Sequence, residues 1–279
     1  MLINAYYERA YNVTHGIEDE VRPIYKRWQR DSETARQILN AHLDCRYGDA
    51  NRETIDLFIA DEPTTRWLVF IHGGYWRVTE KSLYSFIAAS FVKAGYNVAI
   101  PEYDLCPAVT LLTLIEQCRR AIAWLTKNAS EYSPGCDEIV LSGHSAGGHL
   151  TGMMFATDWQ TYDVNPDIFI GGIALSGLFD LDPLIQTEKN TAIKLTLDEA
   201  VALSPARLTP QINAPLVLVA GARESSEFHR QNHVLHGAPG WDRITSAPLS
   251  LANIQHFDIL DAFMDINSDM WQTLDKLQS

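Results

Sequence analysis

The sequence has few of the features that mark secreted, membrane-spanning or nucleic-acid-binding proteins. Only four of its 279 residues are cysteine; none form a C-x-x-C pair, and their spacing is too wide for a small disulfide scaffold. No apolar run reaches the ~18 residues of a membrane span, and the first residues lack a basic segment followed by an apolar run, as a secretory signal requires. Lysine and arginine number 22 against 35 aspartates and glutamates, and the net charge of -13 opposes binding to a nucleic-acid backbone or an anionic membrane. We therefore expect a cytoplasmic protein with reduced cysteines and with no nucleic-acid or membrane partner.

The remaining composition is that of a globular domain. Apolar residues make up 46% and charged residues 20% of the chain, which excludes collagen-like, disordered and repeat-array proteins. From residue 54 onward, short apolar segments alternate with amphipathic ones. Strands are expected at 55–59 (half-buried), 67–71, 97–100, 139–142, 168–175, 216–220 and, more weakly, 247–252, with helices at 83–94, 111–125, 146–157 and 226–236. This alternation predicts an α/β fold with a mostly parallel sheet covered by helices on both faces.

We expect one domain over residues 1–279, with two additions to the sheet and its helices. Residues 1–47 are polar with scattered aromatics and a helix-like run at 32–39, and we interpret them as an amino-terminal arm packed on the main fold. Residues 180–210 are long and irregular enough to form a cap. Because right-handed crossovers bring the carboxyl ends of parallel strands to one edge, the functional site is expected at that edge, beneath the cap.

The most informative motif is the G-x-S-x-G at residues 143–147, centred on Ser145. It follows an expected strand and opens an expected helix, which is the context of the nucleophile turn in α/β-hydrolases. Only very small residues fit two positions either side of the serine, and Gly143 and Gly147 supply them. The alternative is a glycine-rich turn capped by serine. We favour Ser145 as a nucleophile.

A second glycine-containing motif, residues 72–76 (HGGYW), follows the strand expected at 67–71. In a hydrolase of this type, the loop there supplies backbone N–H groups that bind the oxyanion. We expect the oxyanion hole to form from Gly73, Gly74 and Tyr75, with Ala146 N–H from the nucleophile turn. His72 is interpreted as a structural residue that holds the loop by hydrogen bonds.

The serine needs a base, and in this fold the chain order is serine, acid, histidine. His256 lies after the last expected strand and before the terminal helix, where that histidine belongs. Three other histidines cluster on one helix at helical spacing, a pattern that also occurs in metal sites: His229, His233 and His236. No H-E-x-x-H motif accompanies them, so we expect no metal and no cofactor.

The acid should follow the strand at 216–220, and the loop there contains no aspartate. The candidates are Glu224, nearer the strand end, and Glu227, which suits the first turn of the next helix. We favour Glu224 because a triad acid must orient the imidazole from the loop.

These motifs resemble the kynurenine formamidase (arylformamidase) branch of the α/β-hydrolase fold. The resemblance rests on the HGGYW at 72–76 and the GHSAGGHL at 143–150, and it extends to residues 176–181, 224–231, 256–257 and the amino-terminal arm. Members often have aspartate where this chain has Glu224. The resemblance implies hydrolysis of N-formyl-L-kynurenine to L-kynurenine and formate through an acyl-serine.

That implied substrate is a small aromatic molecule, and Tyr75, Trp76 and Phe179 are candidates to stack on its ring. The alternative for these three is ordinary packing beside the site. Competing functions are a carboxylesterase or an amidase for other N-acyl aryl amines, and a non-catalytic hydrolase-fold binding protein. The sequence leaves the oligomeric state open, a homodimer included.

Overall fold

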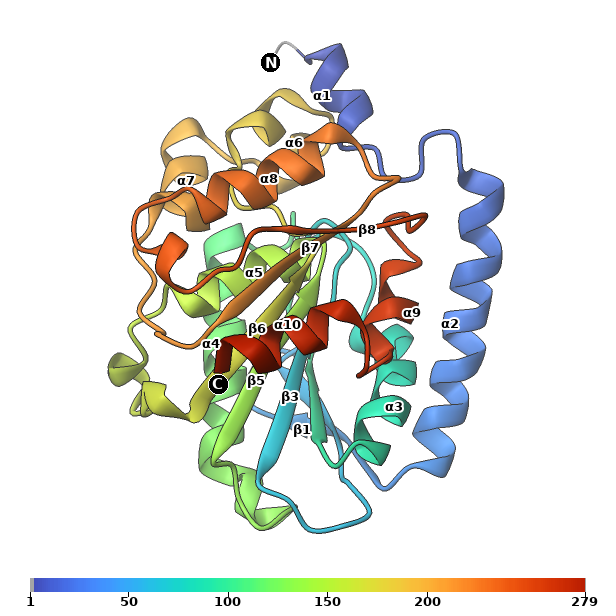
Figure 1. The fold of residues 1–279 in the computed structure, drawn as a ribbon, viewed down its shortest axis with the longest axis vertical. Coiled ribbons are helices and arrows are strands. Elements are labelled where there is room, and N and C mark those ends of the chain that lie inside the picture. Colours follow the sequence, from blue (N-terminus) through green and yellow to red (C-terminus); the bar gives the residue numbers. More distant parts are fainter. Residues whose placement is uncertain (1–2, 279) are drawn as a thin grey trace.

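A computed structural model describes residues 3–278 and contains one eight-stranded sheet (Figure 1). The strand order is β1-β2-β4-β3-β5-β6-β7-β8; β2 pairs antiparallel with β1 and β4, and the strands from β4 to β8 run parallel. The strands are β1 (Ala41–Arg46), β2 (Thr54–Phe58), β3 (Arg66–Ile71), β4 (Asn97–Pro101), β5 (Glu138–His144), β6 (Phe169–Leu175), β7 (Leu216–Gly221) and β8 (Leu249–Leu251). The expected α/β fold with a mostly parallel sheet is confirmed.

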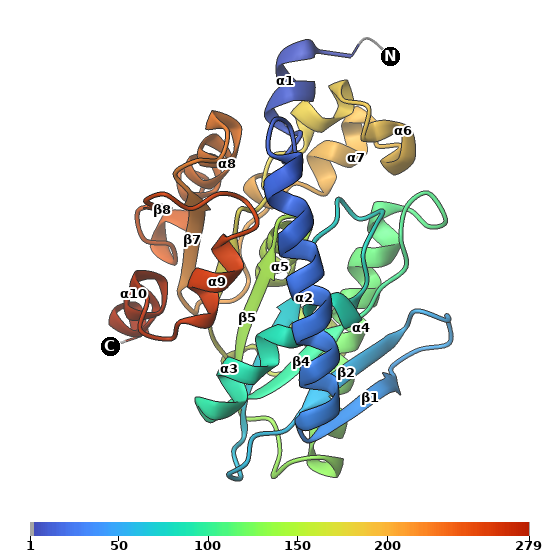
Figure 2. The same ribbon diagram turned by 90° about the vertical axis from the view of Figure 1, so that its right-hand side faces the viewer.

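Helices cover both faces of this sheet, as expected from its continuous apolar strands. Alternate residues of each strand point to opposite faces, so Trp67, Val69 and Ile71 of β3 belong to one core cluster, whereas Leu68 and Phe70 belong to the other. The first cluster is closed by α4 (Leu111–Asn128), α5 (Ala146–Phe155) and α8 (Ser226–His236). The second is closed by α2 (Glu18–Ile38), α3 (Ala88–Lys93), α9 (Ile259–Met264) and α10 (Asp269–Gln278). Figure 2 shows α2 running along this second face in front of α3.

The amino-terminal arm is larger and better integrated than the sequence indicates. Its helix α2 spans Glu18–Ile38 rather than 32–39, and the buried face of this helix packs Trp28 on the core. The last part of the expected arm, Ala41–Arg46, is the edge strand β1. The interpretation of residues 1–47 as an arm outside the sheet is therefore wrong for Ala41–Arg46, which form strand β1 of the sheet.

Strand β2 also differs from the expectation of a half-buried strand, since all five of its residues are buried. The polar position, Asp56, is compensated by two cations: Lys81 Nζ lies 2.7 Å from Asp56 Oδ1, and Arg36 of α2 pairs with its other oxygen. Partnering of this kind is what permits a carboxylate to be buried.

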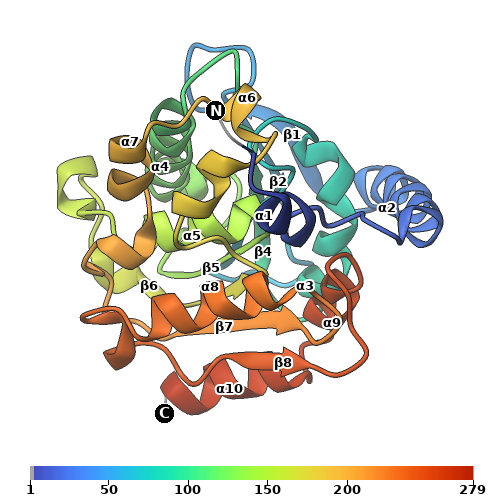
Figure 3. The same cartoon turned by 90° about the horizontal axis from the view of Figure 1, so that it is seen from above.

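The edge formed by the carboxyl ends of the parallel strands is covered by the start of the arm and by residues 180–210 (Figure 3). The arm contributes α1 (Ala5–Ala10). Residues 180–210 fold into two short helices, α6 (Asn190–Ile193) and α7 (Leu197–Ala202), and two 3-10 turns, η5 (Asp182–Gln186) and η6 (Pro205–Arg207). We propose that this segment is a cap, because it lies over the carboxyl ends of the strands.

Candidate active site

Ser145 occupies a strained turn between β5 and α5. Its backbone has φ 58° and ψ -116°, an unusual conformation for a residue with a side chain. The turn is held by Ser145 N–H, which donates to Leu175 O at 2.8 Å. Ser145 is the N-cap of α5 and lines a cavity of about 540 Å³. The chain therefore presents this hydroxyl at the amino end of a helix, where the helix dipole favours negative charge.

The glycines around Ser145 are required by close backbone approach. A Cβ on Gly143 would lie 2.3 Å from Gly147 O, and a Cβ on Gly147 would lie 1.9 Å from Ile71 O. Both distances are far below van der Waals contact. The strand-to-helix turn thus has no room for larger side chains at these two positions, as the G-x-S-x-G motif predicts.

His256 and Glu224 form a direct hydrogen-bonded pair. His256 Nδ1 donates to Glu224 Oε2 at 2.6 Å, and the two side chains are 5% and 1% exposed. The other carboxylate oxygen, Oε1, accepts from Ser176 Oγ at 2.6 Å and from Gly221 N–H at 2.7 Å. A carboxylate held at both oxygens fixes the orientation of the imidazole and its Nδ1–H tautomer.

Glu227, the other candidate acid, points elsewhere. Its carboxylate accepts from Tyr11 Oη at 2.7 Å and pairs with Arg230 Nε at 2.8 Å, and it makes neither a hydrogen bond nor an ion pair with His256. This residue ties the amino-terminal arm to α8. The geometry therefore supports Glu224 as the acid in our proposal.

The two buried histidines that flank Ser145 in the sequence, His144 and His149, stay neutral. His144 Nε2 lies 2.8 Å from His256 O, and burial, aided by the nearby imidazole of His256, lowers the pKa of His144 well below its usual value. Burial likewise lowers the pKa of His149 to about 4, and its Nε2 lies 2.8 Å from Leu203 O. These two rings hold backbone carbonyls in place and add no charge at neutral pH.

The loop at 72–76 approaches Ser145 closely. A Cβ on Gly73 would lie 3.2 Å from Ser145 Cβ. Gly74 and Tyr75 have φ of 108° and 50°, and within residues 3–278 their N–H groups make no hydrogen bond. Ala146 is the first residue of α5, so its N–H has no acceptor within the helix. Gly74 and Tyr75 line the same cavity as Ser145, which supports the proposed oxyanion hole.

His72 holds this loop, as the sequence predicts. It is fully buried, its Nε2 lies 2.9 Å from Glu102 Oε1, and its Nδ1 lies 2.8 Å from Gly73 O. Tyr103 stacks on the ring with centroids 4.2 Å apart and donates through its hydroxyl to His72 O at 2.7 Å. The loop is therefore rigidly attached to the core beneath it.

Of the three candidate aromatic contacts, only Tyr75 lines the cavity. Trp76 and Phe179 are fully buried in the core: Trp76 packs edge-on against His149, and the Phe179 ring fills the space beside Gly177. These positions match the alternative of packing beside the site and correct the expectation that both rings face a substrate.

The sequence reasoning missed the aromatic residues that do form the cavity wall. Tyr25 and Trp28 of α2, Tyr84 of η1 (Lys81–Ile87) and Phe257, the neighbour of His256, line it together with Tyr75. The indole N–H of Trp28 is buried and has no acceptor among the described residues. The only signal available in the sequence was the unusual density of aromatics in the arm.

No group of three metal-ligating side chains occurs within the described part of the chain. His236 of the histidine cluster instead hydrogen-bonds through Nδ1 to Thr245 Oγ1 at 2.7 Å. The four cysteines are free thiols, and burial raises the pKa of Cys106 to about 11 and that of Cys136 to about 12, so neither is a thiolate at neutral pH. None of the helices in residues 3–278 has the length and apolar character needed to cross a membrane.

The fold and the placement of these side chains define a hydrolase of the α/β-hydrolase fold. The chain belongs to the BD-FAE family, whose model matches residues 55–224. Among curated proteins it is similar to the kynurenine formamidase of Salmo salar, 29% identical over 93% of this chain and 90% of that protein. The kynurenine formamidase of Drosophila melanogaster is 27% identical over 94% and 89% of the two chains. These relatives confirm the resemblance inferred from the motifs.

Solved structures agree on the fold. A protein from Silicibacter sp. described as a proposed thioesterase is 29% identical, covers 98% of both chains and superposes with a TM-score of 0.83. Esterase B from Lactobacillus rhamnosis, 18% identical, covers 94% of this chain and 96% of its own, with a TM-score of 0.70.

Proposed function

We propose that this protein hydrolyses N-formyl-L-kynurenine to L-kynurenine and formate. The observation that carries the proposal is the shared cavity: Ser145, His256, Gly74 and Tyr75 all line it, and its wall is aromatic. Similarity to kynurenine formamidases over nearly the whole chain supports the choice of substrate.

In the proposed mechanism, His256 Nε2 takes the proton of Ser145 Oγ as this oxygen attacks the formyl carbon. The N–H groups of Gly74, Tyr75 and Ala146 would stabilise the oxyanion, and one such donor typically contributes ~3 kcal/mol. The protonated imidazole, held by Glu224, then gives its proton to the departing aryl amine. Water, activated by the same histidine, releases formate from the formyl-serine.

The leaving group explains why an esterase-type site can cleave this amide. An aryl amine leaves far more readily than an alkyl amine because its lone pair is delocalised into the ring. The aromatic side chains of the cavity wall offer stacking surfaces for that ring. The same site chemistry would cleave small esters, which makes substrate comparison the deciding measurement.

The test compares kcat/KM for N-formyl-L-kynurenine, p-nitrophenyl acetate and an aryl amide with a longer acyl chain. We expect the formyl substrate to be preferred and Ser145→Ala to abolish turnover of all three. Fast ester cleavage with negligible activity on N-formyl-L-kynurenine would overturn the substrate. A folded wild-type protein that a serine-reactive organophosphonate leaves unlabelled would overturn the nucleophile.

We further propose that the enzyme works in the cytoplasm with its four cysteines reduced and without a cofactor. The free thiols in the structure support this location. A homodimer is the assembly to test first, by light scattering coupled to gel filtration.

A further inference from the structure

Four charged side chains line the cavity that contains Ser145. Two are acidic and two are basic: Glu8 of α1, Arg77 beyond the oxyanion loop, and Glu188 and Lys189 of the cap. The proposed catalytic steps use none of them. They lie on three different parts of the chain, so only the fold brings them together.

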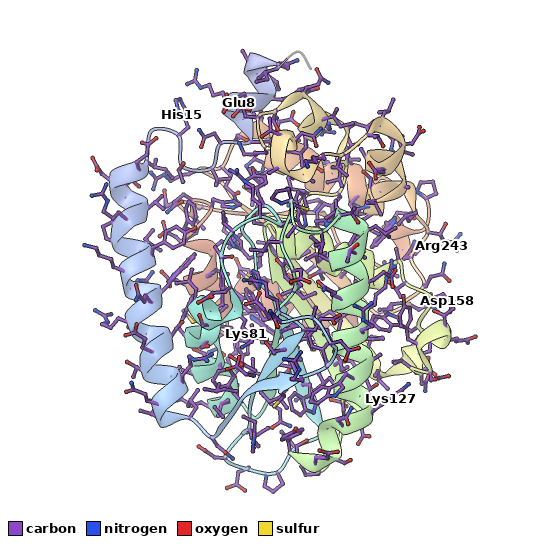
Figure 4. All side chains as sticks on the ribbon, turned by 180° about the vertical axis from the view of Figure 1, so that it is seen from behind. Glu8, His15, Lys81, Lys127, Asp158 and Arg243 are labelled. Atoms are coloured by element: carbon purple, nitrogen blue, oxygen red, sulfur yellow. The ribbon has the colours of Figure 1, made fainter. Side chains whose placement is uncertain are left out.

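Two of these charges already satisfy each other. Lys189 Nζ lies 3.7 Å from Glu8 Oε1 and 5.2 Å from the centre of the Tyr75 ring, and the Lys189 side chain is only 9% exposed. The other oxygen of Glu8 accepts from the backbone N–H of Glu188 at 2.7 Å. Glu8, which lies at the amino-terminal end of the molecule in Figure 4, therefore fastens the arm to the cap.

The other two charges have no such partner. Within residues 3–278, the side chains of Arg77 and Glu188 take part in no hydrogen bond and no ion pair, and both residues are exposed. Arg77 is held in place by its backbone, since its N–H donates to Gly74 O at 3.1 Å. Arg77 and Glu188 both line the cavity that contains Ser145, together with Tyr75 and Lys189.

The cavity thus has one unused cation, Arg77, which directly follows the oxyanion loop, and one unused anion, Glu188 of the cap. An unpaired guanidinium is well suited to a carboxylate, which it binds through two parallel N–H groups. An unpaired carboxylate suits an ammonium group. A ligand that satisfies both carries the two opposite charges of an α-amino acid.

We propose that Arg77 binds the α-carboxylate and Glu188 the α-ammonium of a zwitterionic aromatic amino acid whose acylated ring amine is positioned at Ser145. This inference rests on the proposed function and extends it, because it assigns the groups that distinguish the amino-acid substrate from a simple aryl formamide. Both residues bind the part of the substrate that does not react. They therefore act on KM more than on kcat, because the contact is the same in ground and transition states.

The experiment uses two pairs of substrates that share the same formanilide. N-formyl-L-kynurenine is compared with its α-carboxamide, which lacks the carboxylate, and with its desamino acid, which lacks the ammonium. For Arg77→Ala we expect the kcat/KM for N-formyl-L-kynurenine to fall at least tenfold more than that for the carboxamide, mainly through KM. For Glu188→Gln we expect the fall in kcat/KM to be about fivefold larger for N-formyl-L-kynurenine than for the desamino acid. Arg77→Lys should restore part of the loss because it retains the charge without the paired geometry.

Arg243→Ala is the matched control, since Arg243 is an exposed arginine of η7 (Trp241–Arg243) on the side of the molecule away from α2 (Figure 4). We expect it to leave the substrate ratios unchanged. If a variant lost kcat/KM equally on both substrates of its pair, or on neither, the assignment of the substituted residue would be overturned. Turnover of N-formyl-L-kynurenine by the wild type would still support the proposed function in that case. If the wild type did not turn over N-formyl-L-kynurenine, the proposed function and this inference would both fail.

Discussion

Replacing Glu224 with glutamine tests how the proposed base is oriented. The change keeps the shape of the side chain and replaces one carboxylate oxygen by an amide NH₂ group. The amide oxygen can still accept from Ser176 Oγ and Gly221 N–H, the two donors that hold Oε1. The amide NH₂ then faces His256 Nδ1, which can no longer donate to it. The imidazole proton must move to Nε2, where it prevents His256 from accepting the proton of Ser145.

The expected magnitude follows from this wrong tautomer. The corresponding change in a serine-protease triad lowers kcat by about 10⁴-fold. Allowing for residual flexibility of the longer glutamine, we expect a loss of ~10³ to 10⁴, which corresponds to about 4 to 5.5 kcal/mol of barrier. The free energy of unfolding should fall by only ~1 to 3 kcal/mol, since one charge-assisted hydrogen bond is lost and the other two are retained.

The assay is kcat for p-nitrophenyl acetate, a substrate that needs the triad whatever the physiological substrate is. Glu227→Gln is the matched control, because Glu227 pairs with Arg230 and Tyr11 rather than with His256. Thermal unfolding of both variants checks that each is folded. A Glu224→Gln enzyme within tenfold of Glu227→Gln would refute the assignment of the acid.

Three further predictions concern the support of the site. The pKa of His149 is about 4 in the folded protein and about 6.5 in the unfolded chain, so its neutral form contributes stability that is complete above pH 6.5 and is lost as the pH falls toward 4. The wild-type protein should therefore lose about 2 kcal/mol of unfolding free energy through this residue between pH 7 and pH 5. His149→Gln should remove that part of the pH dependence, as measured by urea titration at both pH values. An unchanged pH dependence would show that His149 is not buried and neutral. Gly147→Ala should lower the free energy of unfolding by several kcal/mol and esterase kcat at least 100-fold, because the added Cβ would lie 1.9 Å from a backbone oxygen. Gly237→Ala is the control: its Cβ would lie 3.3 Å from the nearest atom, so both the free energy of unfolding and kcat should change little. Tyr11→Phe should cost ~1 to 3 kcal/mol in chemical denaturation and speed proteolysis of the arm, since the buried hydroxyl joins Glu227 to the arm at 2.7 Å. Tyr6 is 56% exposed, and its hydroxyl reaches the other oxygen of Glu227 at the longer distance of 3.3 Å, so Tyr6→Phe should cost much less. Equal effects would contradict this account.

The parallel strands could be predicted because each is a continuous apolar run that is buried on both faces. The edge strand β1 could not, since His42, Leu43 and Asp44 are exposed and the strand pairs irregularly with β2. Full burial of β2 was also hidden, because the cations that compensate Asp56 come from distant parts of the chain. Local pattern identifies a strand well when its burial is uniform and poorly when burial depends on a partner.

The same distinction applies to the site. The proposed nucleophile and base, Ser145 and His256, could be chosen from a motif and from chain order, which are properties of the sequence itself. The sequence favours Glu224 over Glu227 as the acid from its position near the strand end. Which carboxylate reaches the imidazole depends on the path of the loop after β7, which a motif does not specify. The contribution of Tyr25 and Trp28 to the cavity wall depends on how a helix packs across the sheet, and residue type alone does not specify that.

The position of α2 along the sheet has a consequence for how such an enzyme can be altered. The segment matched by the family model, residues 55–224, includes Ser145 and Glu224 but neither His256 nor α2. Part of the cavity wall therefore comes from a helix that supplies none of the proposed catalytic groups. Substitutions on its inner side can reshape the space for the acyl amine while the loops that hold the reacting atoms stay in place, so selectivity and catalytic rate can be varied through separate stretches of the chain.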